Sequence, residues 1–131
     1  MAQATVVLLS SAFTGGVAYS LTIMAAVRHI VMFGIKEDAT EEQLANLSSA
    51  LYGMKPKISQ IKELTVGQDL KLASGQTHPA GKNRGVVVTV DFANADDYEV
   101  YASHADHKAV IEDFIKPVME PGSRAAIQIN I

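Results

Sequence analysis

The segment VRHIVMFGI, residues 27–35, decides the fold of this chain. Its side chains alternate between two faces as in a β-strand, and both faces are apolar. One face carries Val27, His29, Val31, Phe33 and Ile35, and the other carries Ile30 and Met32. Because large exposed apolar patches are unfavourable in water, both faces of this strand must be covered by other parts of the protein or by a partner.

A capped helix is predicted after this strand. The motif TEEQ, residues 40–43, is a capping box in which Thr40 accepts a backbone N–H bond and Gln43 returns one. Apolar residues then recur at helical spacing, at Leu44, Leu47, Leu51 and Met54. We therefore predict a helix over residues 41–54, which Pro56 ends because its ring disfavours helical geometry in the residue before it.

A second strand and a long loop come next. Residues 58–66 are predicted to form the strand, and Gly67 closes it. Residues 68–85 hold glycines and a proline without periodicity, which is typical of a surface loop. Structureless loops of this length often have a functional role.

The last part of the chain is predicted to contain two strands around a second helical region. Alternation of apolar side chains predicts strands over residues 86–92 and 125–131. Between them, Asn94 is placed to cap a helix, and helical spacing continues to about residue 115 with a break at 103–105.

The predicted order β-α-β-β-α-β is that of the ferredoxin-like α+β fold, a four-stranded antiparallel sheet with two helices on one face. Two helices cover only one side of such a sheet. The other side is also apolar on this prediction, and a second copy of the same sheet would cover it through a twofold axis. We therefore expect a homodimer with the arrangement of a dimeric α/β barrel, and a larger oligomer is the alternative.

Composition excludes several classes of protein. A chain of 131 residues with 48% hydrophobic and 19% charged residues fits one folded domain rather than a disordered chain. The net charge is −3 and no cluster of Lys or Arg is present, so we expect no nucleic-acid partner. The absence of cysteine excludes disulfides, thiolate metal sites and a cysteine nucleophile.

Residues 1–25 form a separate segment without a charged side chain. The apolar run at 4–13 has the length of a signal-peptide core and residues 18–20 loosely fit a cleavage site, but no positive residue precedes the run. A flexible tail, or a mispredicted start with Met24 as the true one, are the alternatives. We expect a domain over 26–131, no membrane span, and a cytoplasmic location unless a leader is cleaved for another compartment.

Two segments carry a family resemblance. VRHIVMF, residues 27–33, and DYEVYASHADH, residues 97–107, resemble the stress-responsive dimeric α/β-barrel (Dabb) family, as do the helix capped at Thr40 and the turn VGQDL at 66–70. The resemblance covers about residues 26–131 and implies the same fold and a homodimer.

The resemblance also implies site residues. The pairing of Arg28 with His29, combined with the spacing of Tyr101, His104 and His107, is its most specific part. Plant polyketide cyclases of this family close a linear chain by an aldol condensation. By similarity to them, His107 is the catalytic histidine of the second helical region, His29 is the active-site histidine of the first strand, and Tyr101 is the pocket tyrosine.

The chemistry of these residue types agrees with that implication. His29 and His107 lie on apolar faces of a strand and a helix, where a neutral imidazole can take a proton and a tyrosine hydroxyl can stabilise an enolate. The residues expected to line a ligand pocket are His29, Tyr98, Tyr101, His107 and Phe114. The alternative is that the histidines and aromatic rings are core residues with satisfied polar atoms.

The sequence therefore leaves two hypotheses for function. In the first, each protomer has a small apolar pocket that binds a carbonyl-bearing or aromatic metabolite. The most specific version of this hypothesis adds cyclase-like catalysis by proton transfer. In the second, the protein is a non-catalytic stress-response protein that acts through stable assembly. His104 and His107 could be two ligands of a metal ion, but the sequence has no third ligand at a spacing typical of metal sites. We therefore expect no metal and no cofactor.

Overall fold

The main sheet contains four antiparallel strands in the order β4-β5-β3-β6. The computed structural model describes residues 7–11, 18–22, 25–74, 79, 81 and 83–131. The strands are β3 (Val27–Phe33), β4 (Glu63–Gln68), β5 (Val86–Phe92) and β6 (Ala125–Asn130). The segment that begins at residue 27 is an interior strand of this sheet, paired with β5 on one side and with β6 on the other.

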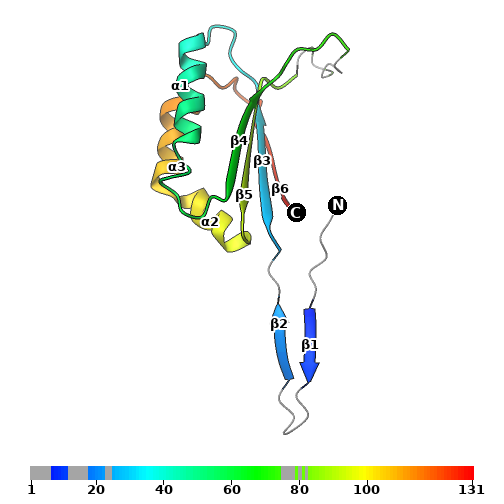
Figure 1. Ribbon diagram of the computed structural model, residues 1–131. Coiled ribbons are helices and arrows are strands. Elements are labelled where there is room, and N and C mark those ends of the chain that lie inside the picture. Colours follow the sequence, from blue (N-terminus) through cyan, green and yellow to red (C-terminus); the bar gives the residue numbers. More distant parts are fainter. Residues whose placement is uncertain (1–6, 12–17, 23–24, 75–78, 80, 82) are drawn as a thin grey trace.

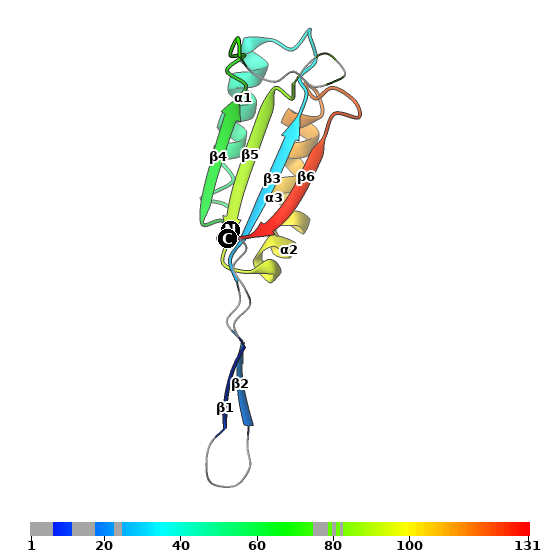
Figure 2. The ribbon, with the colours of Figure 1, turned by 90° about the vertical axis from the view of Figure 1, so that its right-hand side faces the viewer.

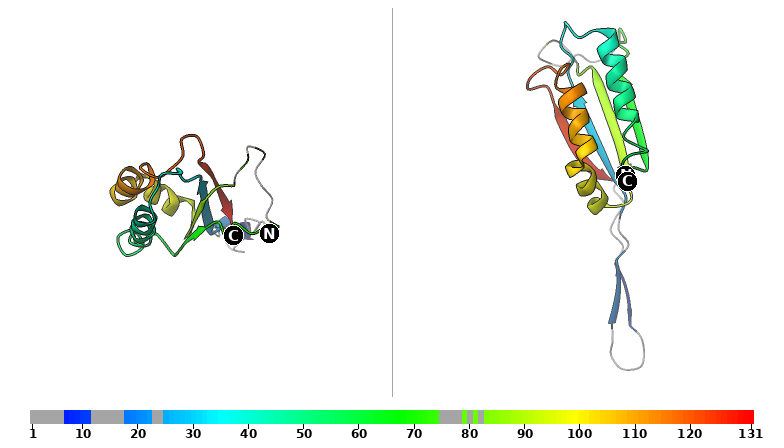
Figure 3. Two further views of the ribbon diagram at one scale, coloured as in Figure 1. Left: turned by 90° about the horizontal axis from the view of Figure 1, so that it is seen from above. Right: turned by 90° about the vertical axis from the view of Figure 1, so that its left-hand side faces the viewer.

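The helices cover one face of this sheet, which confirms the predicted ferredoxin-like α+β fold (Figure 1). They are α1 (Glu41–Tyr52), α2 (Ala95–Ser103), α3 (Ala105–Val110) and η1 (Ile111–Ile115), the last a turn of π-helix. Seen from above and from the helix side, α1 runs beside the unit made by α3 and η1 (Figure 3). No helix formed by the described residues lies on the opposite face of the sheet.

The hydrophobic core lies between the sheet and the helices. Its fully buried side chains are Phe33, Leu47, Leu51, Met54, Ile58, Val88, Val90, Phe92 and Val118. Every second residue of β3 and β5 is buried there, which is the burial pattern of a strand with one face on a core. His29 belongs to this buried set and faces the helices with its apolar neighbours.

The face of the sheet without helices is also apolar. We call Ile30, Met32, Val87, Ile127 and Ile129 the outer patch; strand register places them on one face. Exposed fractions of 41% for Met32, 57% for Ile127 and 40% for Ile129 show that the described part of a single chain leaves this patch largely uncovered. At one end of the patch, the Arg28 guanidinium binds both carboxylate oxygens of Asp91 at 2.7 and 2.9 Å.

The prediction of a second strand over residues 58–66 is wrong for its first half. β4 begins at Glu63 and runs to Gln68, whereas residues 58–62 lie in turns and a bend. The Ile58 N–H donates to the Met54 carbonyl at 2.9 Å, so the chain continues to turn after α1. Ile58 and Ile61 are buried in the core with the end of α1. Their apolar spacing therefore reflects packing under a helix and not a strand.

The main sheet is preceded by a β-hairpin, which we did not predict from the sequence. β1 (Val7–Ser11) and β2 (Ala18–Thr22) pair antiparallel, with Leu9 opposite Ser20 (Figure 2). No other described element contacts these two strands. The predicted leader, tail or alternative start concerns residues 1–25, of which 1–6, 12–17 and 23–24 lie outside the described residues.

The capping box at α1 provides a first test of the local structure. The Thr40 hydroxyl accepts the Gln43 N–H at 3.1 Å, and the Gln43 side chain accepts the Thr40 N–H at 2.9 Å. We expect Thr40→Ala to lower the free energy of unfolding by about 1 kcal/mol and Thr40→Ser to change it by only a few tenths. Urea denaturation of the three proteins measures this; equal stability of the alanine variant and the wild type would contradict it.

Candidate functional site

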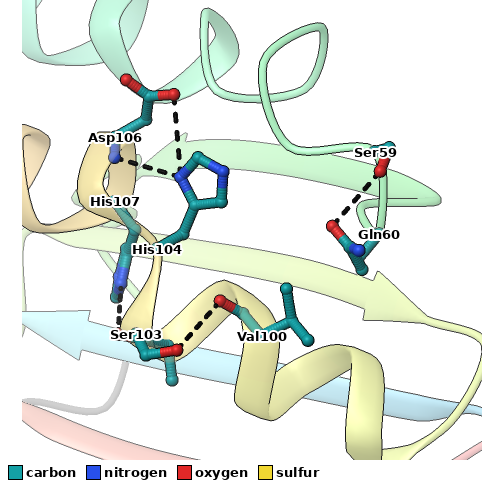
Figure 4. Close-up of polar contacts among 8 residues, drawn as sticks. Ser59, Gln60, Val100, Ser103, His104, Asp106 and His107 are labelled. Atoms are coloured by element: carbon teal, nitrogen blue, oxygen red, sulfur yellow. Dashed lines mark hydrogen bonds and ion pairs between the residues drawn. The ribbon is translucent and has the colours of Figure 1, made fainter.

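The break between α2 and α3 places the two histidines of this region differently. His104 is extended, with φ −68° and ψ 137°, and it is the N-cap of α3. Its Nδ1 accepts the Asp106 N–H at 3.1 Å and lies 3.6 Å from the Asp106 carboxylate (Figure 4). This confirms the predicted break and gives His104 a structural role at the helix terminus. His107, one turn further, is half-buried, and its ring centre lies 4.1 Å from that of Tyr101.

Four of the five predicted pocket residues come together between the sheet and the helices. The Tyr101 ring centre lies 4.1 Å from that of His107 and 6.0 Å from that of His29. The Tyr98 ring lies 5.3 Å from His29, and Phe92 of β5 contacts both tyrosines at 5.1 and 5.8 Å. Strand β3, α2 and α3 therefore each contribute to one cluster, with Tyr101 between the histidines.

Phe114 lies apart from these rings. It belongs to η1, about 10 Å along the helix axis from His107, and its side chain is 36% exposed. Within the described residues, no ring contact joins it to the other four. The wider turn of η1 changes the helical spacing on which the sequence-based grouping of His107 with Phe114 relied.

Burial makes His29 a neutral imidazole at pH 7. Its side chain is 4% exposed, and desolvation lowers the pKa of His29 from 6.5 to about 4, with smaller contributions from the positive charge of Arg124 and from His107. The Gln128 side-chain amide nitrogen donates to His29 Nδ1 at 2.8 Å. His29 is thus held by a neutral partner and not by a carboxylate.

His107 and Tyr101 are also held in their neutral forms. Burial lowers the pKa of His107, Arg124 and His104 lower it further, and a hydrogen bond to the Ala102 carbonyl acts in the opposite direction. His107 Nδ1 lies 3.3 Å from that carbonyl oxygen (Figure 4). Burial, with a smaller effect of Tyr98, raises the pKa of Tyr101, so its hydroxyl keeps its proton.

β6 is the edge strand of the sheet beside the cluster. All residues of β6 are exposed, including Gln128, which faces the helix side of the sheet beside His29. Tyr98 and His107 are half-buried, whereas His29 and Tyr101 are buried at 4% and 2% exposure.

Two residues near the cluster were missed by sequence reasoning. Gln128 and Arg124 looked like ordinary polar residues around the last strand, and their positions follow only from the register of β6 against β3. The alternation of this strand indicated that Gln128 shares a face with Ala126, but nothing in the sequence gave the strand beside it. Arg124 stands immediately before β6 and acts electrostatically on both histidines.

A separate cavity of about 860 Å³ opens beyond the other end of β3. Ile35, Leu44, Gln68 and Leu72 are among its lining residues, and no residue of the histidine cluster is among them. The loop predicted over 68–85 contributes to this cavity, with residues 75–78, 80 and 82 outside the described residues. The predicted site and this cavity are therefore distinct places in the fold.

Neither a metal site nor a membrane-spanning helix is found among the described residues. In the described part of the chain, no group of three or more His, Asp or Glu side chains is placed to hold a metal ion. No helix among the residues described has the length and apolar character needed to cross a membrane.

The comparison with protein families gives a match over the main domain. The family model described as Stress responsive A/B Barrel Domain matches residues 27–131. This range begins at the first residue of β3 and leaves the hairpin outside. A search of curated proteins gave no significant match.

Solved structures similar to the chain have the same fold. A dimeric ferredoxin-like protein of unknown function from Thermobifida fusca is 28% identical, with a TM-score of 0.68, covering 82% of this chain and 92% of that one. A dimeric protein of unknown function from Bacteroides fragilis is 26% identical, with a TM-score of 0.63 and coverages of 81% and 96%. A hydroxynitrile lyase from Passiflora edulis is 19% identical, with a TM-score of 0.69 and coverages of 82% and 94%, and shows the fold alone.

Proposed function

Because the chain belongs to the stress-responsive A/B barrel domain family, we propose that it forms a homodimer and that each protomer binds a carbonyl compound at His29, Tyr101 and His107 and transfers a proton to or from it. Dimeric solved structures of this fold support the first part. The outer patch supports it as well, because a second copy of the sheet would remove its exposed apolar side chains from water.

One observation carries the proposed chemistry: a protonated tyrosine lies between two neutral imidazoles. Tyr101 is 4.1 Å from His107 and 6.0 Å from His29 by ring centres, and all three are in their neutral forms at pH 7. A neutral imidazole can remove a proton from an acidic C–H or O–H bond. A tyrosine hydroxyl can donate a hydrogen bond to the oxygen where negative charge develops.

This arrangement suits more than one reaction at a carbonyl group. In an aldol cyclisation of the kind performed by the plant olivetolic acid cyclase, to which we infer a resemblance, the base removes a proton next to a carbonyl. The enolate carbon then forms a bond to a second carbonyl carbon of the same chain, and the oxygen of that carbonyl takes up the proton. In the cleavage of a hydroxynitrile, the base removes the O–H proton, the carbon–carbon bond breaks, and cyanide leaves and takes up the proton. Both reactions use one base and one donor to oxygen. Tyr98 and Phe92, whose rings belong to the cluster, would contact the organic part of the ligand.

The second candidate is a stress-response protein that acts through assembly alone. The size and exposure of the outer patch favour it, since such a patch stabilises an oligomer whether or not a ligand binds. Native mass spectrometry of the full chain, purified without added ligand, separates the two. A dimer that carries a small molecule supports the first candidate, and a ligand-free ring larger than a dimer supports the second.

Replacing His107 is expected to remove the base. We expect His107→Ala to reduce kcat/KM by about 10²- to 10⁴-fold, the usual contribution of a positioned acid–base group. An aromatic cyanohydrin, followed by release of cyanide, and a linear polyketide acid, followed by formation of the aromatic ring, are the two probes.

His104→Asn is the matched control for that experiment. His104 caps α3 outside the ring cluster, and asparagine is a good N-cap residue, so this variant should keep wild-type turnover. If the wild type neither binds nor converts either probe, or if His107→Ala is as active as the wild type, the catalytic proposal is wrong.

A further inference from the structure

We propose that Gln128 is a positioning residue that keeps the proton of neutral His29 on Nε2, so that His29 is a hydrogen-bond donor to the ligand while His107 is the base. This inference rests on the proposed function for its consequence in catalysis. The two hydrogen bonds that carry it are present in the protein without a ligand, so they can be tested separately.

The bond between Gln128 and His29 determines the tautomer of His29. Register places Gln128 of β6 directly opposite His29 of β3, and the amide nitrogen lies 2.8 Å from Nδ1. An amide N–H can only donate, so Nδ1 must offer its lone pair. A neutral imidazole has one N–H, and the proton of His29 is therefore on Nε2.

The bond between His107 and Ala102 determines the opposite tautomer. The Ala102 carbonyl oxygen can only accept, and His107 Nδ1 lies 3.3 Å from it. Nδ1 of His107 therefore carries the proton, and its Nε2 has a free lone pair. His107 can take a proton from a ligand in this form, whereas His29 cannot take one at Nε2.

At neutral pH neither ring takes up a second proton, so the two histidines keep their different tautomers. Burial holds His29 and His107 in their neutral forms, and the positive charge of Arg124 acts in the same direction on both. Among the described residues, no carboxylate is hydrogen-bonded to either ring. The neutral partners Gln128 and Ala102, and not the charge of the rings, therefore decide which histidine donates and which accepts.

The class of ligand follows from this division. His29 and Tyr101 are two donors on neighbouring rings, 6.0 Å apart by their centres, and the ring centre of the base, His107, lies 4.1 Å from that of Tyr101. Two donors suit a carbonyl oxygen that becomes negative, and the base suits an acidic C–H or O–H bond near it. We therefore assign the site to a ligand whose carbonyl oxygen takes up charge during the reaction.

Nitrogen-15 NMR of the histidine rings in the full chain tests the proposal directly. At neutral pH, the wild type should show an unprotonated Nδ1 and a protonated Nε2 for His29, and the reverse for His107. In Gln128→Glu, the carboxylate can only accept, so the His29 proton should move to Nδ1 while His107 stays unchanged. Asn130→Asp is the matched control, because it puts the same charge on the same face of β6 opposite Val27, and it should leave both tautomers unchanged.

Either of two results would overturn the proposal: a wild-type His29 with its proton on Nδ1, or a Gln128→Glu spectrum identical to that of the wild type. Gln128 is exposed on an edge strand, so its variants should fold. Gln128→Leu provides a second test by the same NMR measurement. Without the amide, His29 should lose its preference for the Nε2–H tautomer.

Activity measurements distinguish failure of this inference from failure of the proposed function. If the protein converts a probe, Gln128→Glu should reduce kcat by roughly a hundredfold with a smaller change in KM, as for loss of one donor to a developing oxyanion. Full activity of Gln128→Glu together with a moved proton would show that His29 does not donate to the ligand. A correct tautomer pattern without turnover of any probe would contradict the proposed function and leave the role of Gln128 intact.

Discussion

Ile127→Asp is expected to convert the proposed homodimer into monomers and to raise its dissociation constant at least about a thousandfold, which corresponds to about 4 kcal/mol. Ile127 lies opposite Ile30 in the middle of the outer patch and is 57% exposed in the single chain. In a dimer formed through this face, the twofold axis would place two carboxylates in an apolar interface without a partner. The effective cost of burying an unpaired charge is several kcal/mol for each ion.

Val100→Asp is the control for the change of an exposed aliphatic residue to a charge. Val100 is 43% exposed on α2, on the helix side of the sheet, so this variant should remain dimeric. Sedimentation equilibrium over a range of protein concentrations measures both dissociation constants. If Ile127→Asp dimerises as tightly as Val100→Asp, the dimer does not use the outer patch.

The second large effect expected is a loss of stability in acid caused by His29. The pKa of His29 is about 4 in the folded protein and 6.5 in a fully hydrated chain, so between these values the unfolded state binds the proton more readily. The contribution of His29 is therefore complete above about pH 6.5 and is lost as the pH falls toward 4. Over this window the free energy of unfolding should decrease by about 3 kcal/mol through this residue alone.

Comparison with a variant isolates this contribution from those of other titrating groups. His29→Gln cannot be protonated and can still pair with the Gln128 amide, so its stability should fall by about 3 kcal/mol less than that of the wild type between pH 7 and pH 4. Urea denaturation at one protein concentration is the measurement, because the stability of a dimer depends on concentration. Thr40→Ala should show the wild-type pH dependence. Parallel curves for His29→Gln and the wild type would contradict a buried, neutral His29.

The elements with strong local signals could be predicted from the sequence. Alternation identified β3 and β5, and the caps at Thr40 and Asn94 located the starts of α1 and α2. The strand predicted from Ile58 was wrong at its start because apolar spacing reports burial, and Ile58 is buried by packing against the end of α1 and not by strand pairing. The pairing of β1 with β2 had no turn signal that the sequence analysis used.

The candidate site was predictable in its types of residue but not in its geometry. His29, Tyr101 and His107 could be selected because polar side chains on apolar faces are unusual. That Tyr101 lies between the two histidines depends on how α2 and α3 are set on the sheet. Gln128 could not be selected, since its partner is fixed by strand register, a tertiary property that the alternation of β6 alone does not contain.

The pairing of β6 with β3 also has a consequence for how the protein folds. His29 and Gln128 are 99 positions apart along the chain, and no local contact brings them together. Contacts between segments so distant in sequence form slowly, because the entropy of closing the chain is lost before the contacts stabilise it. The hydrogen bond from Gln128 to His29 therefore forms only when β6 pairs with β3, and the tautomer proposed for His29 would be fixed late in folding.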